Sequence, residues 1–167
     1  MQPKVKKTKT PEQALAALMR LAARAERSSG DALRLMRNWG VEPAAQREVL
    51  RKLIDMRFID DVRYAEAFVR DKLKFSGWGT FKIRAALRAK GISSEIAERA
   101  LGQADPKTSR ERLRQSLARK RKSVKAATDR ELRDKLMRYG ASLGYDFASV
   151  AEAVSEIVKT DSEWSDF

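Results

Sequence analysis

Apolar residues recur every three or four positions along most of this 167-residue chain, which is the spacing of amphipathic helices. A clear example is the stripe formed by Leu15, Leu18, Ala22 and Ala25. No segment shows the alternation of polar and β-branched residues that is typical of strands. The pattern therefore predicts an all-α fold of nine helices without a sheet.

The starts of these helices are marked by residues that cap helix N-termini. Thr10 to Gln13 and Thr128 to Glu131 are capping boxes, in which two side chains bond reciprocally to free backbone N–H groups. Pro11 adds a proline at the first helical position, where its missing N–H costs nothing. The other helices are expected to begin at or just after Ser28, Pro43, Asp60, Thr80, Ser93, Asp105 and Asp146.

Three glycines, Gly40, Gly91 and Gly144, are spaced by 51 and 53 residues and mark an internal repeat. Each unit is predicted to be a long helix, a short helix, a glycine turn and a third helix. The third unit matches least well, because Gly140 stands where the first two units have a large apolar residue. The matching positions are Ala32, Ile83 and Leu136, eight residues before the glycines, and Leu50, Leu101 and Val154, ten residues after them.

The repeat divides the chain into three units that we expect to form an elongated, curved array. Such units are too small to bury their apolar faces alone, so they stack on their neighbours. The predicted units are residues 11–59, 60–104 and 105–159. Residues 1–10 are expected to be a disordered basic arm, and residues 160–167 an acidic tail.

The stretch SGWGTFKIRAALRAKG, residues 76–91, places two glycines before a basic helix and could be a phosphate-binding loop. A P-loop, however, follows a strand and ends in Gly-Lys-Ser or Gly-Lys-Thr, and neither condition holds here. Ser28 to Gly30 occupy the same place in the first unit. The glycines are therefore predicted to form a turn, with Trp78 packed on the helix pair.

Positive charge is concentrated in the first three quarters of the chain. Lys and Arg total 36 and Asp and Glu total 23, a net charge of +13. Residues 1–127 carry a net +17, and residues 128–167 a net −4. A basic body indicates contact with nucleic acid or an acidic protein surface, and a well-solvated helical surface is the simpler alternative.

The chain contains no histidine and no cysteine, which removes the commonest general base and the thiolate nucleophile. Asp60 and Asp61 could form a carboxylate metal site, but their position before an apolar helical pattern favours capping. We therefore expect no catalysis, metal or cofactor. The lack of cysteine suits a reducing cytosol, and no stretch has the apolar length of a membrane span or a signal peptide. A cytoplasmic location is expected.

Residues 60–101, DDVRYAEAFVRDKLKFSGWGTFKIRAALRAKGISSEIAERAL, resemble the central signature of the RecX regulatory proteins. The shared elements include Asp-Asp-x-Arg-Tyr-Ala, the Gly-x-Gly turn and Lys90-Gly91-Ile92, in the same order and spacing. Weaker similarity extends from about residue 12 to residue 158, whereas RYGASLG and WSDF depart from the family pattern. The resemblance implies three tandem three-helix units. It also implies a non-enzymatic modulator that binds the RecA recombinase filament and restrains strand exchange in homologous recombination, DNA repair and the SOS response.

Helical geometry indicates which basic residues are free for binding. Beside the apolar positions Ile83 and Leu87, Arg84 and Arg88 are predicted to project away from the core. The helix from 107 to 125 carries nine basic residues and one acidic residue, a density suited to phosphates or to carboxylates lining a protein filament. The candidate RecA- or DNA-binding residues are Arg70, Lys72, Lys74, Lys82, Arg84, Arg88, Lys90, Arg119, Lys120, Arg121 and Lys122.

Two classes of function remain open. One is a regulator, expected to be a monomer, that lies along a RecA–DNA filament. The other is a helix-turn-helix-like protein that binds DNA directly. A protein that reads bases presents Asn, Gln and Arg along one exposed helix. The short helices here carry mainly Arg, Lys and Ala, with Asn38 as their one amide, which favours recognition of shape or charge.

Overall fold

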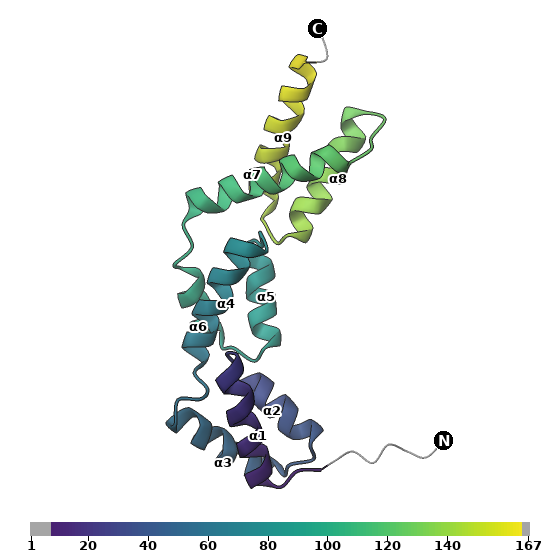
Figure 1. Cartoon of the computed structure of the whole chain (residues 1–167). Helices are drawn as coiled ribbons and strands as arrows, with labels where there is room; N and C mark the ends of the chain where they lie inside the picture. The colour runs from purple at the N-terminus through teal and green to yellow at the C-terminus, as the bar shows by residue number, and fades with distance from the viewer. Residues whose placement is uncertain (1–7, 165–167) are drawn as a thin grey trace, which may run out of the picture. The chain divides into compact units, whose positions relative to one another are not determined.

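The computed structural model describes residues 8–164 of the chain, and the side chains of residues 8–159. Within these residues the chain forms nine helices and no strand, as the apolar pattern predicts (Figure 1). The helices are α1 Pro11–Arg24, α2 Ser29–Asn38, α3 Pro43–Asp55, α4 Asp61–Phe75, α5 Thr80–Ala89, α6 Ser94–Leu101, α7 Pro106–Ser123, α8 Asp129–Ser142 and α9 Phe147–Trp164.

The helix starts follow the capping residues of the sequence. Thr10 and Gln13 form the predicted capping box at α1. The carboxylate of Asp105 accepts hydrogen bonds from two backbone N–H groups at the start of α7, the shorter being 2.9 Å long from Thr108. α5 begins at Thr80, as expected, but Thr80 is its first residue and not its N-cap. Gly79 is the cap, because its carbonyl oxygen accepts the first helical bond of α5, from the Ile83 N–H.

The glycines that mark the repeat end the second helix of each unit in the left-handed conformation. Gly40, Gly91 and Gly144 have φ angles of +68°, +76° and +90°. Residues with a Cβ rarely adopt such angles, so glycine is the residue that turns the chain after α2, α5 and α8. The glycine turns predicted from the repeat are confirmed.

Among the described residues, unit 1, one of two compact units, comprises residues 8–67 and Leu87–Ala97. Its core lies among α1, α2 and α3, and the side chains of Leu18, Met36 and Leu53 are almost wholly buried there. Residues 8–10, which we assigned to the basic arm, belong to this unit. The Lys9 N–H donates to the Trp39 carbonyl at 3.0 Å, and its ammonium lies 5.1 Å from the Trp39 ring centroid. The rest of the arm lies outside the described residues.

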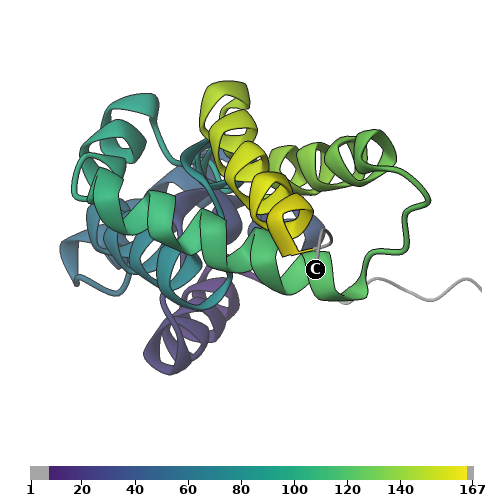
Figure 2. The same cartoon turned by 90° about the horizontal axis from the view of Figure 1, so that it is seen from above.

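Unit 2 comprises, among the described residues, Phe68–Ala86 and residues 98–164. Its core lies among α7, α8 and α9, and α9 crosses α7 (Figure 2). Gly140 explains why the third repeat departs from the pattern. A Cβ on Gly140 would lie 2.9 Å from one methyl of Val150 and closer still to the other, so α8 and α9 pack without a side chain between them. The expected acidic tail begins inside α9, and its side chains lie outside the described residues.

The helices of the predicted second repeat, residues 60–104, are divided between the two units. Their apolar positions are buried as expected, with Ile83 and Leu87 both fully inaccessible. The outer sides of these helices carry most of the candidate binding residues. The boundaries of the three repeats and the elongated, curved arrangement stay predictions.

Candidate binding surface

Lys72 and Lys82 hold their ammonium groups against one aromatic ring. Their Nζ atoms lie 4.6 and 4.5 Å from the centroid of the half-buried Trp78 ring, within the range of a cation–π interaction. Phe68 meets the same indole edge to face at 6.4 Å. Trp78 therefore packs on α4 and α5 as predicted, and it also fixes two cations. We refer to Phe68, Lys72, Trp78 and Lys82 as the Trp78 cluster.

Arg70 and Lys74 are exposed cations of α4 that make only weak surface contacts. The Arg70 Nε lies 3.5 Å from the Asp71 carboxylate, and both side chains are more than half exposed. Surface pairs of this kind contribute little to stability. The Lys74 Nζ lies 5.1 Å from the centroid of the exposed Phe75 ring. Both side chains can therefore leave these contacts and bind a partner at a small cost in free energy.

Arg84 is held by an intramolecular partner that the sequence did not indicate. Its guanidinium donates two hydrogen bonds to the Glu98 carboxylate and lies 5.5 Å from the Phe81 ring centroid. The side-chain hydrogen bond lowers the pKa of Glu98 below its ordinary value and raises the pKa of Arg84. About a third of the Arg84 side chain stays exposed. An acidic ligand of Arg84 therefore competes with Glu98.

Arg88 and Lys90 differ, although both were predicted to bind. Arg88 is exposed, and no described residue forms an ion pair with it. Lys90 instead lies 3.3 Å from the buried Asp31 carboxylate, which Arg34 also contacts at 2.6 Å. This geometry indicates a structural role for Lys90 inside unit 1 and leaves Arg88 available to a partner.

The C-terminal part of α7 presents the basic run Arg119 to Lys122. Arg119 donates to the Ser116 hydroxyl at 3.3 Å, and the Lys120 ammonium lies 5.1 Å from the Tyr139 ring centroid. Lys122 is exposed, whereas Arg121 is half-buried. Three of the four side chains thus reach solvent, and this run is a second basic surface on unit 2.

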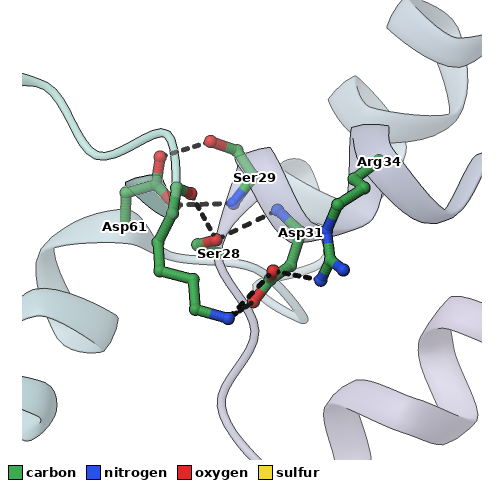
Figure 3. A network of polar contacts seen from close by, with 6 residues as sticks. Ser28, Ser29, Asp31, Arg34 and Asp61 are labelled. Carbon is green, nitrogen blue, oxygen red and sulfur yellow. Dashed lines mark hydrogen bonds and ion pairs between the residues drawn. The ribbon is translucent and has the colours of Figure 1, made fainter. Parts of the chain in front are cut away.

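A polar junction in unit 1 was missed by the sequence analysis (Figure 3). The Asp61 carboxylate accepts hydrogen bonds from the Ser29 N–H at 2.8 Å and from the Ser29 hydroxyl at 2.5 Å. The Ser28 hydroxyl donates to the Lys90 carbonyl at 2.7 Å. Ser28 and Ser29 are therefore more than turn residues, because they tie the start of α2 to α4 and to the end of α5.

A corresponding junction in unit 2 depends on backbone contacts. The Gly79 N–H donates to the Leu143 carbonyl at 2.7 Å, and the Phe81 N–H donates to the Gly144 carbonyl at 3.1 Å. The Lys82 ammonium adds a hydrogen bond of 3.2 Å to the Ser142 carbonyl. In both units the start of one short helix thus meets the glycine turn that ends the short helix of the next repeat. The recurring glycines were a signal for this contact.

The pair Asp60 and Asp61 does not assemble a metal site. Asp60 caps α4 by accepting a hydrogen bond of 3.0 Å from the Arg63 N–H, as predicted, and Asp61 binds Ser29. Among the described side chains, no group of three acidic residues lies close enough to hold a metal ion.

Among the residues that the structure describes, no helix has the length and apolar character needed to cross a membrane.

The chain is similar to known proteins over most of its length. A family model described as "RecX, second three-helix domain" matches residues 60–101. The chain is 35% identical over 137 residues to the regulatory protein RecX of Chromohalobacter salexigens, covering 82% of this chain and 88% of that one. It is 31% identical over 144 residues to the regulatory protein RecX of Mycobacterium leprae, covering 86% and 84%.

Two solved structures share the fold. The crystal structure of RecX from Lactobacillus salivarius matches 87% of this chain and 95% of its own, with a TM-score of 0.74 and 24% identity. A crystal structure of regulatory protein RecX matches 87% of this chain and 73% of its own, with a TM-score of 0.80 and 22% identity. With the sequence identities above, these similarities show that the chain belongs to the RecX family of regulatory proteins.

Proposed function

We propose that this protein regulates the RecA recombinase by binding the RecA–DNA filament and lowering its ATPase and strand-exchange activity. The observation that carries the proposal is the 35% identity to a regulatory protein RecX across more than four fifths of both chains. The absence of histidine and cysteine from the sequence supports a non-enzymatic role. We also propose a cytoplasmic monomer; the lack of cysteine suits a reducing compartment.

Cations that are exposed and not held by a strong intramolecular ion pair support contact with an acidic surface. They lie on α4, α5 and α7, and a RecA–DNA filament offers both phosphates and carboxylates. We propose that Arg70, Lys74 and Arg88 contribute most directly, together with Lys122 and the other exposed cations of the α7 run. Arg84 and Lys90 contribute less, because Glu98 and Asp31 already neutralise them.

Direct action on DNA is the second candidate function. The specific observation in its favour is the net charge of +13, which promotes salt-dependent binding to any polyanion. Asn38, the one amide of the short helices, is exposed, but it is the last residue of α2 and stands alone. This placement supports recognition of charge or shape over base reading.

Co-sedimentation separates the two candidates. The protein is mixed with RecA filaments on single-stranded DNA, with the same DNA alone, and with duplex DNA, over a series of salt concentrations. A filament regulator sediments with RecA–DNA at salt concentrations that release it from both bare DNAs, and it slows strand exchange when present below the RecA concentration. Equal binding to bare DNA and filaments, with unchanged strand exchange, would favour the DNA-binding candidate.

A further inference from the structure

Three phenylalanine rings of unit 2 are unusually accessible. Phe75, Phe81 and Phe147 are 74%, 57% and 79% exposed, whereas Phe58 and Phe68 are half-buried. Single apolar residues on a surface are common and need no explanation. Three exposed rings in one compact unit indicate a binding surface, because contact with a partner would remove their apolar area from water.

The three phenylalanines lie close in sequence to one feature of the fold, the junction of Gly79 with Gly144. The Phe81 N–H donates directly to the Gly144 carbonyl at 3.1 Å. Phe147 follows Gly144 by three residues, and Phe75 precedes Gly79 by four residues. Four residues span at most about 14 Å between Cα atoms, so the Cα atom of each phenylalanine lies within about 14 Å of this junction.

Cations accompany the rings. The Lys74 ammonium lies 5.1 Å from the Phe75 centroid, and the Arg84 guanidinium lies 5.5 Å from the Phe81 centroid. Trp78, which lies between these two rings in sequence, holds two further cations, Lys72 and Lys82. Residues 72–84 therefore combine aromatic rings with flanking positive charge, on the last turns of α4, the glycine turn and the first turns of α5.

We propose that Phe75, Phe81 and Phe147 form a stacking surface for the bases of single-stranded nucleic acid, with the neighbouring lysines on its phosphates. Unpaired bases offer the π-faces that stack on aromatic rings, and the backbone supplies the negative charge that the cations need. A duplex buries its base faces, so it complements the cations but not the rings. An apolar protein partner would complement the rings but not the cations.

This inference rests on the proposed function, since it names the partner that this part of the basic surface takes when the protein acts on a nucleoprotein filament. Its test nevertheless needs no RecA. Fluorescence anisotropy of the full chain with labelled oligo(dT), and with a duplex of equal length, reports the two affinities separately. The test variants are Phe75→Ala, Phe81→Ala, Phe147→Ala and the triple combination. Ile54→Ala and Met56→Ala, at exposed apolar positions of unit 1, are matched controls.

A ring that stacks on one base contributes about 5- to 150-fold in affinity. Each single variant is therefore expected to lower oligo(dT) affinity by at least about fivefold, while the controls and the duplex affinity change by less than about twofold. Crosslinking of a bromodeoxyuridine-substituted oligonucleotide should map to peptides that contain these phenylalanines. Thermal melts confirm that the variants fold, which their exposure leads us to expect.

Two results would overturn the inference. One is a triple variant that keeps its oligo(dT) affinity within twofold of the unaltered protein. The other is an equal loss of single-strand and duplex affinity, which would assign the effect to charge or folding. If the triple variant binds oligo(dT) normally but no longer restrains RecA, the rings contact protein, and the stacking surface is refuted while the proposed function stands.

Discussion

Gly30 and Gly91 lie so close together that a Cβ on Gly30 would be 2.9 Å from the Gly91 Cα and closer still to the Lys90 carbonyl. The relationship recurs in unit 2, where a Cβ on Gly79 would be 2.7 Å from the Tyr145 backbone nitrogen and closer still to the Gly144 carbonyl. The obstructing atoms belong to the backbone, so they cannot rotate away. The start of one short helix thus fits against the glycine turn of the next repeat only when both lack side chains.

The first prediction concerns this close approach. Gly79→Ala should lower the free energy of unfolding by about 1–3 kcal/mol, because the added methyl group overpacks a rigid contact. Gly102→Ala is the matched control, since a Cβ there meets its nearest atoms at an ordinary 3.4 Å. Thermal melts or urea titrations measure both. Equal stability of the two variants would show that the junction tolerates a side chain.

The second prediction concerns the polar contacts of unit 1. Asp61→Ala should destabilise the protein by about 1–3 kcal/mol, because it leaves the Ser29 N–H at the start of α2 without its acceptor. Asp71→Ala, which removes an exposed carboxylate, should change stability by less than about 0.5 kcal/mol. Hydrogen exchange of the Ser29 amide gives a local measurement. An amide that stays equally protected in Asp61→Ala would contradict the assignment.

The third prediction concerns the charge state of Glu98. The hydrogen bond from Arg84 lowers the pKa of Glu98, so this pair favours the folded state above the unfolded pKa and loses that contribution as pH falls through the folded pKa. In Arg84→Ala the pKa of Glu98 should rise toward its ordinary value, as measured by NMR titration of the carboxyl carbon. Arg88→Ala is the control on the same helix. An unchanged Glu98 titration would show that the pair does not persist in solution.

The fourth prediction separates the two sides of α5. Leu87→Ala should cost about 2–5 kcal/mol of stability, because its side chain is fully buried. Arg88→Ala should stay within about 0.5 kcal/mol, yet weaken filament or DNA binding and make its salt dependence shallower. Thermal melts and binding titrations over a salt series distinguish these effects. An Arg88→Ala protein that melts at a lower temperature and binds normally would show that Arg88 supports the fold and not binding.

The elements and cores were predictable because their signals are local. Capping residues such as Thr10 and Asp105 act within one turn, and Gly40 and Gly91 are needed for the φ angles of their own residues. Burial of Ile83 and Leu87 follows from their spacing of four residues, which places both side chains on the same apolar face of the helix. The all-α architecture could therefore be derived before any coordinates were known.

Which basic residues form ion pairs within the protein was not predictable in the same way. Arg84 and Arg88 look equivalent on a helical wheel, but Glu98 holds only Arg84. The partner of Lys90 is Asp31, 59 residues away, and only the folding of unit 1 brings them together. Long-range pairs of this kind leave no periodic signal in the sequence. A binding surface predicted from charge alone therefore includes residues that already form ion pairs within the protein.

DNA-stimulated ATP hydrolysis by RecA tests the central proposal most directly. RecA is assembled on single-stranded DNA at low salt, and the unaltered protein is titrated from below the RecA concentration to a molar excess. We expect the rate to fall at substoichiometric ratios, and Arg88→Ala to require a higher concentration for the same effect. A rate that stays unchanged in molar excess of the unaltered protein would contradict the account.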